Sequence, residues 1–155
     1  MPFLSDPRPI VGRVVRMRIE GRDLPAADEL RLRNVHVGVQ RKAEVIDRVP
    51  VSAPSATWEL DVAVREIDGL LDVGGPFVHG RPGARFLYLS WGNVDGTTFQ
   101  MFRRAKLMFG DIPTGVLRAA FEQGGTLVGE LGLTDEYGDP RCARVRPPDI
   151  VWTLR

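Results

Sequence analysis

Cysteine and histidine are scarce in this 155-residue chain, which has one cysteine, Cys142, and two histidines, His36 and His79. A single cysteine cannot form an intramolecular disulfide, and these three residues show none of the paired spacings of a zinc site. The acidic residues at 135–139 belong to an ordinary turn, because their spacing misses that of an EF-hand loop. We therefore expect no metal and no cofactor.

The chain also lacks a long apolar run and an excess of either charge. No segment approaches the ~20 apolar residues of a membrane span, and the first residues lack the basic region and apolar run of a signal peptide. The 21 Lys and Arg against 20 Asp and Glu give a net charge of +1, far from the basic balance typical of nucleic-acid-binding proteins. We expect a cytoplasmic protein with no membrane contact, and the charge balance argues against a nucleic-acid partner.

Motifs for nucleophilic catalysis and phosphate binding are missing as well. The segment nearest to Gly-x-Ser-x-Gly is 88–92, which reads Tyr-Leu-Ser-Trp-Gly, so the nucleophile elbow of α/β-hydrolases is excluded. No glycine-rich loop is followed by Lys-Ser or Lys-Thr, which excludes a P-loop nucleotide site.

Short segments punctuated by 17 glycines and 12 prolines favour strands over long helices. Period-two alternation of apolar and polar residues predicts half-buried strands, and a run that is apolar on both faces predicts a central strand. The alternating segments are 15–20, 35–40 and 58–65, and the run that is apolar on both faces is 85–91. Further strands are expected at 98–108, 127–133 and 144–154, although 98–108 also fits an amphipathic helix.

One helix is expected at 111–123, with Asp111 as N-cap, Pro113 in the first turn and Gly124 just past the end. Its apolar stripe comprises Val116, Leu117, Ala120 and Phe121. The prediction is a mainly β fold in one domain, 1–155, built as an antiparallel barrel or sandwich of about seven strands with one helix packed on it.

Five segments together resemble an uncharacterised bacterial, mainly actinobacterial, domain family of unknown function. They are 34–41, 75–80 with 85–88, 103–106, 133–135 and the surroundings of Cys142. The resemblance covers nearly the whole chain and implies a small, stand-alone, β-rich protein. It carries no activity, because none of these segments is a motif with a known mechanism.

The candidate ligand site is the aromatic run around residue 86 and the basic residues near it. We expect Phe86, Tyr88 and Trp91, together with Phe99 and Met101, to wall a pocket enclosed by the β framework. Arginine would hold an anionic group of the ligand. The candidate anchors are Arg85 and Arg103, and His79 is added because the turn after it places its ring near a loop mouth.

Arg103 is the candidate anchor whose surroundings the sequence predicts most specifically. Strand alternation predicts that it shares the apolar face of 98–108 with Phe99, Met101, Ala105 and Leu107, while Arg104 and Lys106 lie on the wetter face. A guanidinium on an apolar face needs an acidic partner or a bound anion.

The sequence leaves two main functions open and a third, weaker one, which is RNA or single-stranded DNA binding by arginine-rich strands with Trp and Phe as a stacking surface. The first is a small-molecule binding protein or a cofactor-free catalyst of the cyclase or isomerase type, with a small anionic or apolar ligand. The alternative is a non-catalytic interaction module that pairs with itself or with another protein through an exposed edge or loop.

Overall fold

The computed structural model describes residues 11–24, 26–35, 43–51, 55–78, 81–83, 85–132, 143–146 and 149–155. Within these ranges the chain forms eleven strands and one α-helix. The strands are β1 (Val11–Arg22), β2 (Ala27–Val35), β3 (Ala43–Val51), β4 (Ser55–Ile67), β5 (Leu70–Val78), β6 (Arg81–Gly83), β7 (Phe86–Asp95), β8 (Thr98–Met108), β9 (Thr126–Gly132), β10 (Ala143–Arg144) and β11 (Ile150–Leu154). A 3-10 helix (Phe109–Asp111) and α1 (Thr114–Gln123) lie between β8 and β9. The predicted mainly β fold with one helix is confirmed.

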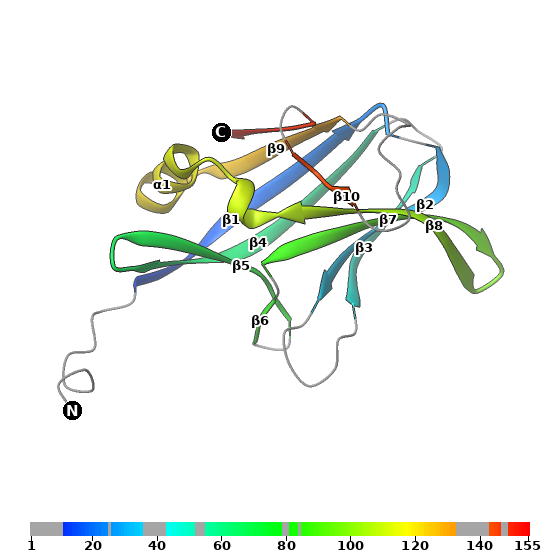
Figure 1. Ribbon diagram of the computed structural model, residues 1–155, viewed down its shortest axis with the longest axis horizontal. Coiled ribbons are helices and arrows are strands. Elements are labelled where there is room, and N and C mark those ends of the chain that lie inside the picture. Colours follow the sequence, from blue (N-terminus) through cyan, green and yellow to red (C-terminus); the bar gives the residue numbers. More distant parts are fainter. Residues whose placement is uncertain are drawn as a thin grey trace.

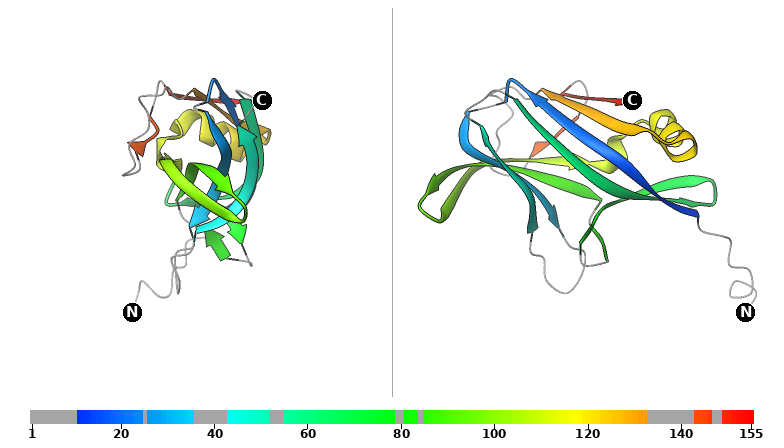
Figure 2. Two further views of the ribbon diagram at one scale, coloured as in Figure 1. Left: turned by 90° about the vertical axis from the view of Figure 1, so that its right-hand side faces the viewer. Right: turned by 180° about the vertical axis from the view of Figure 1, so that it is seen from behind.

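The strands form two sheets that lie over one another (Figure 1). Sheet A has the strand order β11-β9-β1-β4-β5-β6, and sheet B has the order β10-β8-β7-β2-β3. The helix α1 lies at one end of the molecule, and the tip of the β7–β8 hairpin lies at the other (Figure 2). The described strands thus stack as two layers, as in a sandwich.

Two strand pairs correct the expectation of a wholly antiparallel fold. β9 runs parallel to β1, and β10 runs parallel to β8. After β8 the chain leaves sheet B, passes through α1 and enters sheet A as β9, beside β1 and in the same direction.

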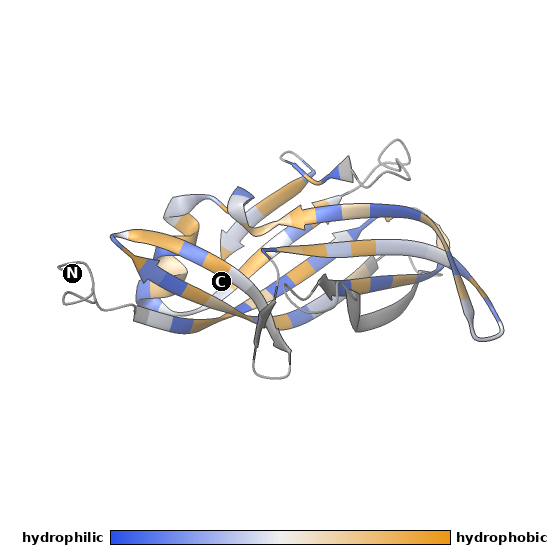
Figure 3. Cartoon of the chain, turned by 60° about the horizontal axis from the view of Figure 1, so that its bottom comes forward, coloured by the Kyte–Doolittle hydropathy of each residue, from blue (hydrophilic) through white to orange (hydrophobic). Residues whose placement is uncertain are grey.

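A single apolar core fills the space between the two layers. Period-two alternation places Val15, Met17 and Ile19 of β1 in this core, while Arg16 and Arg18 point away from it. Figure 3 shows the same alternation as hydrophobic and hydrophilic bands along the strands. The strands predicted at 15–20 and 58–65 are therefore confirmed, with the predicted faces buried.

The remaining strand predictions have mixed outcomes. Residues 98–108 form β8 and not a helix, and β7 lies in the middle of sheet B as predicted for 85–91. The chain predicted as one strand at 144–154 forms two, β10 and β11, in different sheets. Residues 36–40 lie outside the described part of the chain, and the strand found before them is β2.

The helix begins later than predicted. Pro113 is the N-cap of α1 and makes no side-chain capping bond, whereas Asp111 belongs to the preceding 3-10 helix. The carboxylate of Asp111 accepts hydrogen bonds from Arg144, including one of 2.8 Å from Nε. An ion pair with β10 thus replaces the predicted capping bond. Gly124, at φ 80°, ends the helix as predicted.

Candidate functional site

The predicted aromatic wall is divided between the two faces of β7. Trp91 is 0% exposed and lies in the core beside Leu87 and Leu89. Phe86 and Tyr88 lie on the opposite, outer face of sheet B and are half-buried. Because neighbouring side chains of a strand point to opposite faces, Trp91 cannot line one pocket together with Phe86 and Tyr88.

A bulge in β8 divides the predicted wall further. Trp91 faces Arg103 across the β7–β8 pair, but Gly92 faces Met101, so Phe102 is an extra residue in β8. An extra residue reverses the faces of all side chains on one side of it. Arg103 therefore shares a face with Ala105 and Leu107, as predicted, but Phe99 and Met101 lie on the outer face with Tyr88.

Phe86 and Tyr88 form a small cluster with Lys106 on that outer face. The two rings meet edge to face, with centroids 5.0 Å apart and an interplanar angle of 79°. Lys106 Nζ lies 5.0 Å from the Phe86 centroid and 5.8 Å from the Tyr88 centroid. The ammonium group is thus within reach of the negative faces of both rings.

Arg85 lies at a separate place, the mouth of a hollow of about 230 Å³. We call this hollow the end cleft, because it opens where β5, the start of β7, the 3-10 helix and α1 meet. The backbone N–H of Phe109 donates a hydrogen bond of 3.0 Å to the carbonyl oxygen of Arg85, which fixes the 3-10 helix against β7. The cleft wall is apolar at Val73, Phe109, Ile112 and Leu117 and polar at Asp72, Arg85 and Thr114.

Asp72 connects two arginines beside the end cleft. Its carboxylate lies 2.8 Å from Arg65 Nη2 and 3.5 Å from Arg85 Nη2. The Arg85 side chain is 73% exposed, so its contact with Asp72 is weak. Arg85 can therefore turn toward an anion in the cleft mouth at little cost.

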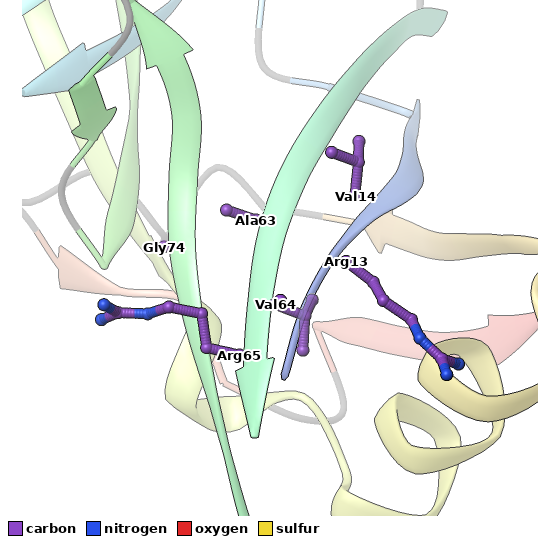
Figure 4. Close-up of a pocket in the computed structure, with 7 residues that line it drawn as sticks. Arg13, Val14, Ala63, Val64, Arg65 and Gly74 are labelled. Atoms are coloured by element: carbon purple, nitrogen blue, oxygen red, sulfur yellow. The ribbon is translucent and has the colours of Figure 1, made fainter. Parts of the chain in front are cut away.

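A second hollow, of about 380 Å³, lies along β1, β4 and β5 of sheet A (Figure 4). Small residues make this groove, because Gly12, Ala63 and Gly74 leave space beside the 63% exposed Val14. The two arginines at its sides extend away from each other (Figure 4). Arg13 donates to the carbonyl oxygen of Phe121, and Arg65 pairs with Asp72.

The described residues offer no cluster of three or more His, Cys, Asp or Glu side chains that could hold a metal ion. His36, His79, Cys142 and the acidic turn at 135–139 lie outside the described residues. Within the same described ranges, no helix has the length and apolarity needed to cross a membrane.

Two arginines have a perturbed pKa, and both are in ion pairs between elements. The hydrogen bond to Glu66 raises the pKa of Arg118 above its ordinary value, and the hydrogen bond to Asp111 does the same for Arg144. Each pair joins distant parts of the chain, β4 with α1 and the 3-10 helix with β10. We read both as structural ion pairs rather than as acid–base groups.

Of the five predicted site residues that the structure describes, it brings Phe86 and Tyr88 together on the outer face of sheet B and places Trp91 opposite Arg103 on the other face. Trp91 lies in the core, Arg103 faces it from β8, Arg85 is at the end cleft, and His79 is outside the described residues. Sequence reasoning missed Asp72, Phe109 and Thr114, which line the cleft with Arg85. They carry no local motif, since the cleft is assembled from four separate elements.

Comparison with protein families gives one match, over residues 15–155, to a family of unknown function, DUF5990. The chain belongs to this family. The match covers most of the chain, so the resemblance found in the sequence is confirmed as one to an uncharacterised domain family. Comparisons with curated proteins and with solved structures found no match.

Proposed function

We propose that this DUF5990 protein is a cytoplasmic binding protein for a small molecule that has an apolar body and one anionic group. The observation that supports this proposal is the composition of the end cleft. Ligand sites in proteins are concave and mostly apolar, with a few polar groups that fix the orientation of the ligand. The end cleft has an apolar wall of core residues and an exposed arginine at its mouth.

The apolar wall would hold the body of the ligand. Phe109 is 1% exposed, Ile112 5% and Leu117 5%, so the core fixes them as a rigid floor, and the accessible apolar surface comes from Leu70, which is 75% exposed. A rigid wall lowers the entropic cost of binding. The 230 Å³ volume is below the range of drug-sized sites, about 300–1,000 Å³, and fits a metabolite of one ring or a short chain.

Arg85 would hold the anionic group. Its planar guanidinium matches a carboxylate or a phosphate with two parallel hydrogen bonds. The 3.5 Å contact with Asp72 is weak because Arg85 is 73% exposed, so the guanidinium is available to the anion. In the catalytic form of this proposal, a cofactor-free cyclisation or isomerisation, the wall would position the substrate and Arg85 would stabilise developing negative charge.

The test uses three probes of this chemistry: benzoate, phenyl phosphate and hexanoate. Native mass spectrometry of the purified protein first shows whether a small molecule has co-purified. Thermal-shift titration should then raise the Tm with at least one probe, and Arg85→Met should weaken that binding about tenfold or more. Arg22→Met is the matched control, because Arg22 is an exposed arginine at the end of β1.

The control variant should bind the probe like the wild type. Equal binding by Arg85→Met would show that the end cleft does not hold the anionic group. An absence of both a co-purified molecule and any response to the three probes would contradict the proposal.

The alternative function is a protein interaction module, and the groove on sheet A favours it. Val14 in this groove is 63% exposed, and Val151 on the edge strand β11 is 52% exposed. Exposed apolar side chains on a sheet edge or groove are typical of association surfaces. Native mass spectrometry separates the two functions, because a dimer without a bound small molecule would favour the interaction module.

A further inference from the structure

The strand β11 forms one edge of sheet A, next to β9. Within the part of the chain that the structure describes, no strand pairs with the other side of β11. Figure 1 shows β11 at the margin of the molecule, beside the C-terminus. The backbone N–H and C=O groups along such an edge can pair with another chain.

The hydrogen bonds to β9 show which backbone groups of β11 point outward. Arg155 and Thr126 exchange two hydrogen bonds, of 2.9 and 2.8 Å. In an antiparallel ladder, residues whose backbone groups bond to the partner strand alternate with residues whose groups point away from it. The odd-numbered residues of β11 therefore bond to β9, and the even-numbered residues have their N–H and C=O groups at the open edge. These outward residues are Ile150, Trp152 and Leu154.

The side chains of the outward residues do not cover this edge. A Cβ atom on Gly129 of β9 would lie 3.1 Å from Ile150 Cδ1 and 3.0 Å from Trp152 Cζ3. A Cβ atom on Gly125 would lie 3.2 Å from Leu154 Cδ1. All three side chains thus lean toward β9. The helix α1 contacts β11, β9, β1 and β5, so it lies across sheet A and not beyond its edge.

Each of the other three sheet edges has a feature that hinders pairing with another chain. β6 has three residues and β10 has two, so they offer few backbone groups. β3 contains Pro50 and shows two register shifts against β2. Short strands, prolines and bulges are common protections of sheet edges. The five residues of β11 include no proline or lysine, and their register with β9 is regular.

The sequence of β11 suits pairing with a second copy of the same strand. It reads Ile-Val-Trp-Thr-Leu, in which four of five residues are β-branched or aromatic and favour strands. Antiparallel pairing with Trp152 opposite Trp152 of the second copy overlaps all five residues. The same register places Ile150 opposite Leu154 of the second copy. Only outward residues then face each other across the pair, so their N–H and C=O groups can exchange hydrogen bonds.

The charges at the two ends of β11 select the antiparallel direction. Asp149 precedes the strand and Arg155 follows it. In the antiparallel register Asp149 of each copy lies opposite Arg155 of the other, whereas parallel pairing would place like charges side by side. Arg155 also pairs with Glu130 and Glu20 of its own chain, and its five N–H donors allow a further carboxylate partner.

We propose that two copies of this chain associate through β11, antiparallel about a two-fold axis at Trp152, so that sheet A continues from one copy into the other. The pairing occupies both open edges, so the assembly closes as a dimer. An edge of five residues buries little surface, so the dimer is weak and depends on concentration. This proposal gives the interaction module considered above a surface and a partner, and it does not depend on the end cleft.

The first experiment blocks the open edge. Sedimentation equilibrium of the full chain between about 1 and 500 μM should show a monomer–dimer equilibrium. Leu154→Pro removes an N–H that points to the open edge and takes no part in the pairing with β9. Because the two-fold axis doubles each loss, this variant should raise the dimer Kd about tenfold or more. The matched control Leu154→Ala also shortens the side chain but keeps the N–H, and its Kd should stay within about threefold of the wild type.

The second experiment reverses the charge at one end of the strand. Asp149→Lys places a cation opposite Arg155 of the second copy at two equivalent positions, so it should raise the dimer Kd about tenfold. Asp61→Lys is the control, because it makes the same change in charge on β4, where the Asp61 side chain is 55% exposed. The control should dimerise like the wild type. Circular dichroism and melting curves confirm that all variants are folded.

The third experiment identifies the surface in the wild-type protein. Amide hydrogen exchange followed by NMR should be fast at Ile150, Trp152 and Leu154 in dilute protein and at least about tenfold slower in concentrated protein. The amides of Val151 and Thr153 bond to β9 and should exchange slowly at both concentrations.

Three results would overturn the proposal. They are a monomer at every concentration, equal dimerisation by Leu154→Pro and Leu154→Ala, and a dimer in which the even-numbered amides of β11 still exchange fast. The last result would place the contact at another surface. Arg85→Met should dimerise like the wild type, so a failure of dimerisation and a failure of ligand binding can be told apart.

Discussion

Gly92 and Phe99 are in direct contact across the β7–β8 pair, and the ring occupies the space that a side chain at position 92 would need. A Cβ atom on Gly92 would lie 2.4 Å from Cε2 of Phe99 and 2.8 Å from the carbonyl oxygen of Gln100. The absence of this Cβ lets the Phe99 ring lie over β7, where Arg31 stacks on it at 3.9 Å. The glycine at position 92 thus allows the stacking of Phe99 with Arg31 beside the bulge of β8.

We predict that Gly92→Ala lowers the free energy of unfolding by about 1–3 kcal/mol, the usual cost of an inserted methyl group without space. The added carbon meets backbone as well as the ring, so a rotation of Phe99 alone cannot relieve the clash. Urea unfolding measures the effect. Gly132→Ala is the control in another strand, because a Cβ there meets nothing within 4 Å, and equal stability of the two variants would contradict the predicted contact.

Trp91 provides a test of whether it belongs to the core or to a ligand site. We predict that Trp91→Ala costs about 3–5 kcal/mol of unfolding free energy, the range for a large aromatic removed from a core. The side chain is 0% exposed, whereas that of Phe102 is 40% exposed, so Phe102→Ala should cost clearly less. Urea unfolding of both variants makes the comparison, and similar losses would mean that Trp91 is not packed in the core.

Strands could be predicted from the sequence where one face is exposed to solvent and the other is buried in the core. β1 and β4 follow this rule, and their alternation alone assigns Met17 and Trp58 to the core. The Asp-Gly step at 95–96 correctly favoured a strand over a helix for β8, since such a step suits a hairpin turn. Gly96 indeed has a φ of 60°.

Alternation predicted the faces of β8 correctly from Arg103 to Leu107 but not for Phe99 and Met101. A bulge places Phe99 and Met101 on the outer face, and no local sequence pattern indicates this bulge. The helix start was also missed, since Asp111 satisfies the rule for an N-cap but pairs with Arg144, 33 residues later in the chain. Such a long-range ion pair has no local signal.

The candidate sites depend on the same long-range information. The end cleft joins β5, β7, the 3-10 helix and α1, and only the fold brings these segments together. The cluster of Phe86, Tyr88 and Lys106 depends on the register of β7 and β8. Composition gave the total charge correctly, but the fold decides which charges share a face.

Arg103 and Arg104 lie on opposite faces of β8, and their substitution should separate the two environments. Arg103 faces Trp91 on the core side, so Arg103→Met should lower the free energy of unfolding by about 1–3 kcal/mol, within the usual range of a substitution at a packed position. Arg104→Met acts on the outer face of sheet B and should change the free energy of unfolding by less than about 1 kcal/mol. Urea unfolding measures the free energy of unfolding of both variants. Equal losses would show that the faces of these two residues are wrongly assigned.

Arg118 links α1 to sheet A through its ion pair with Glu66. Its contribution to the stability of the fold should not depend on pH in the neutral and moderately alkaline range. Its guanidinium pairs with Glu66 of β4 and donates a hydrogen bond of 2.8 Å to the carbonyl oxygen of Gly69. We predict that Arg118→Met lowers the Tm, but by less than Trp91→Ala, because the pair is partly exposed to solvent.

The sign of the pH effect follows from the direction of the pKa shift. The hydrogen bond to Glu66 raises the pKa of Arg118 in the folded protein above its ordinary value. The stabilisation is therefore complete below the pKa of the unfolded chain and is lost only as the pH rises through the higher pKa of the folded state. Both values lie far above pH 10, so the Tm difference between wild type and Arg118→Met should be the same at pH 7 and pH 10. Melting curves at the two pH values test this, with Arg22→Met as the exposed control; a difference that shrinks at pH 10 would mean that a group other than Arg118 titrates in this contact.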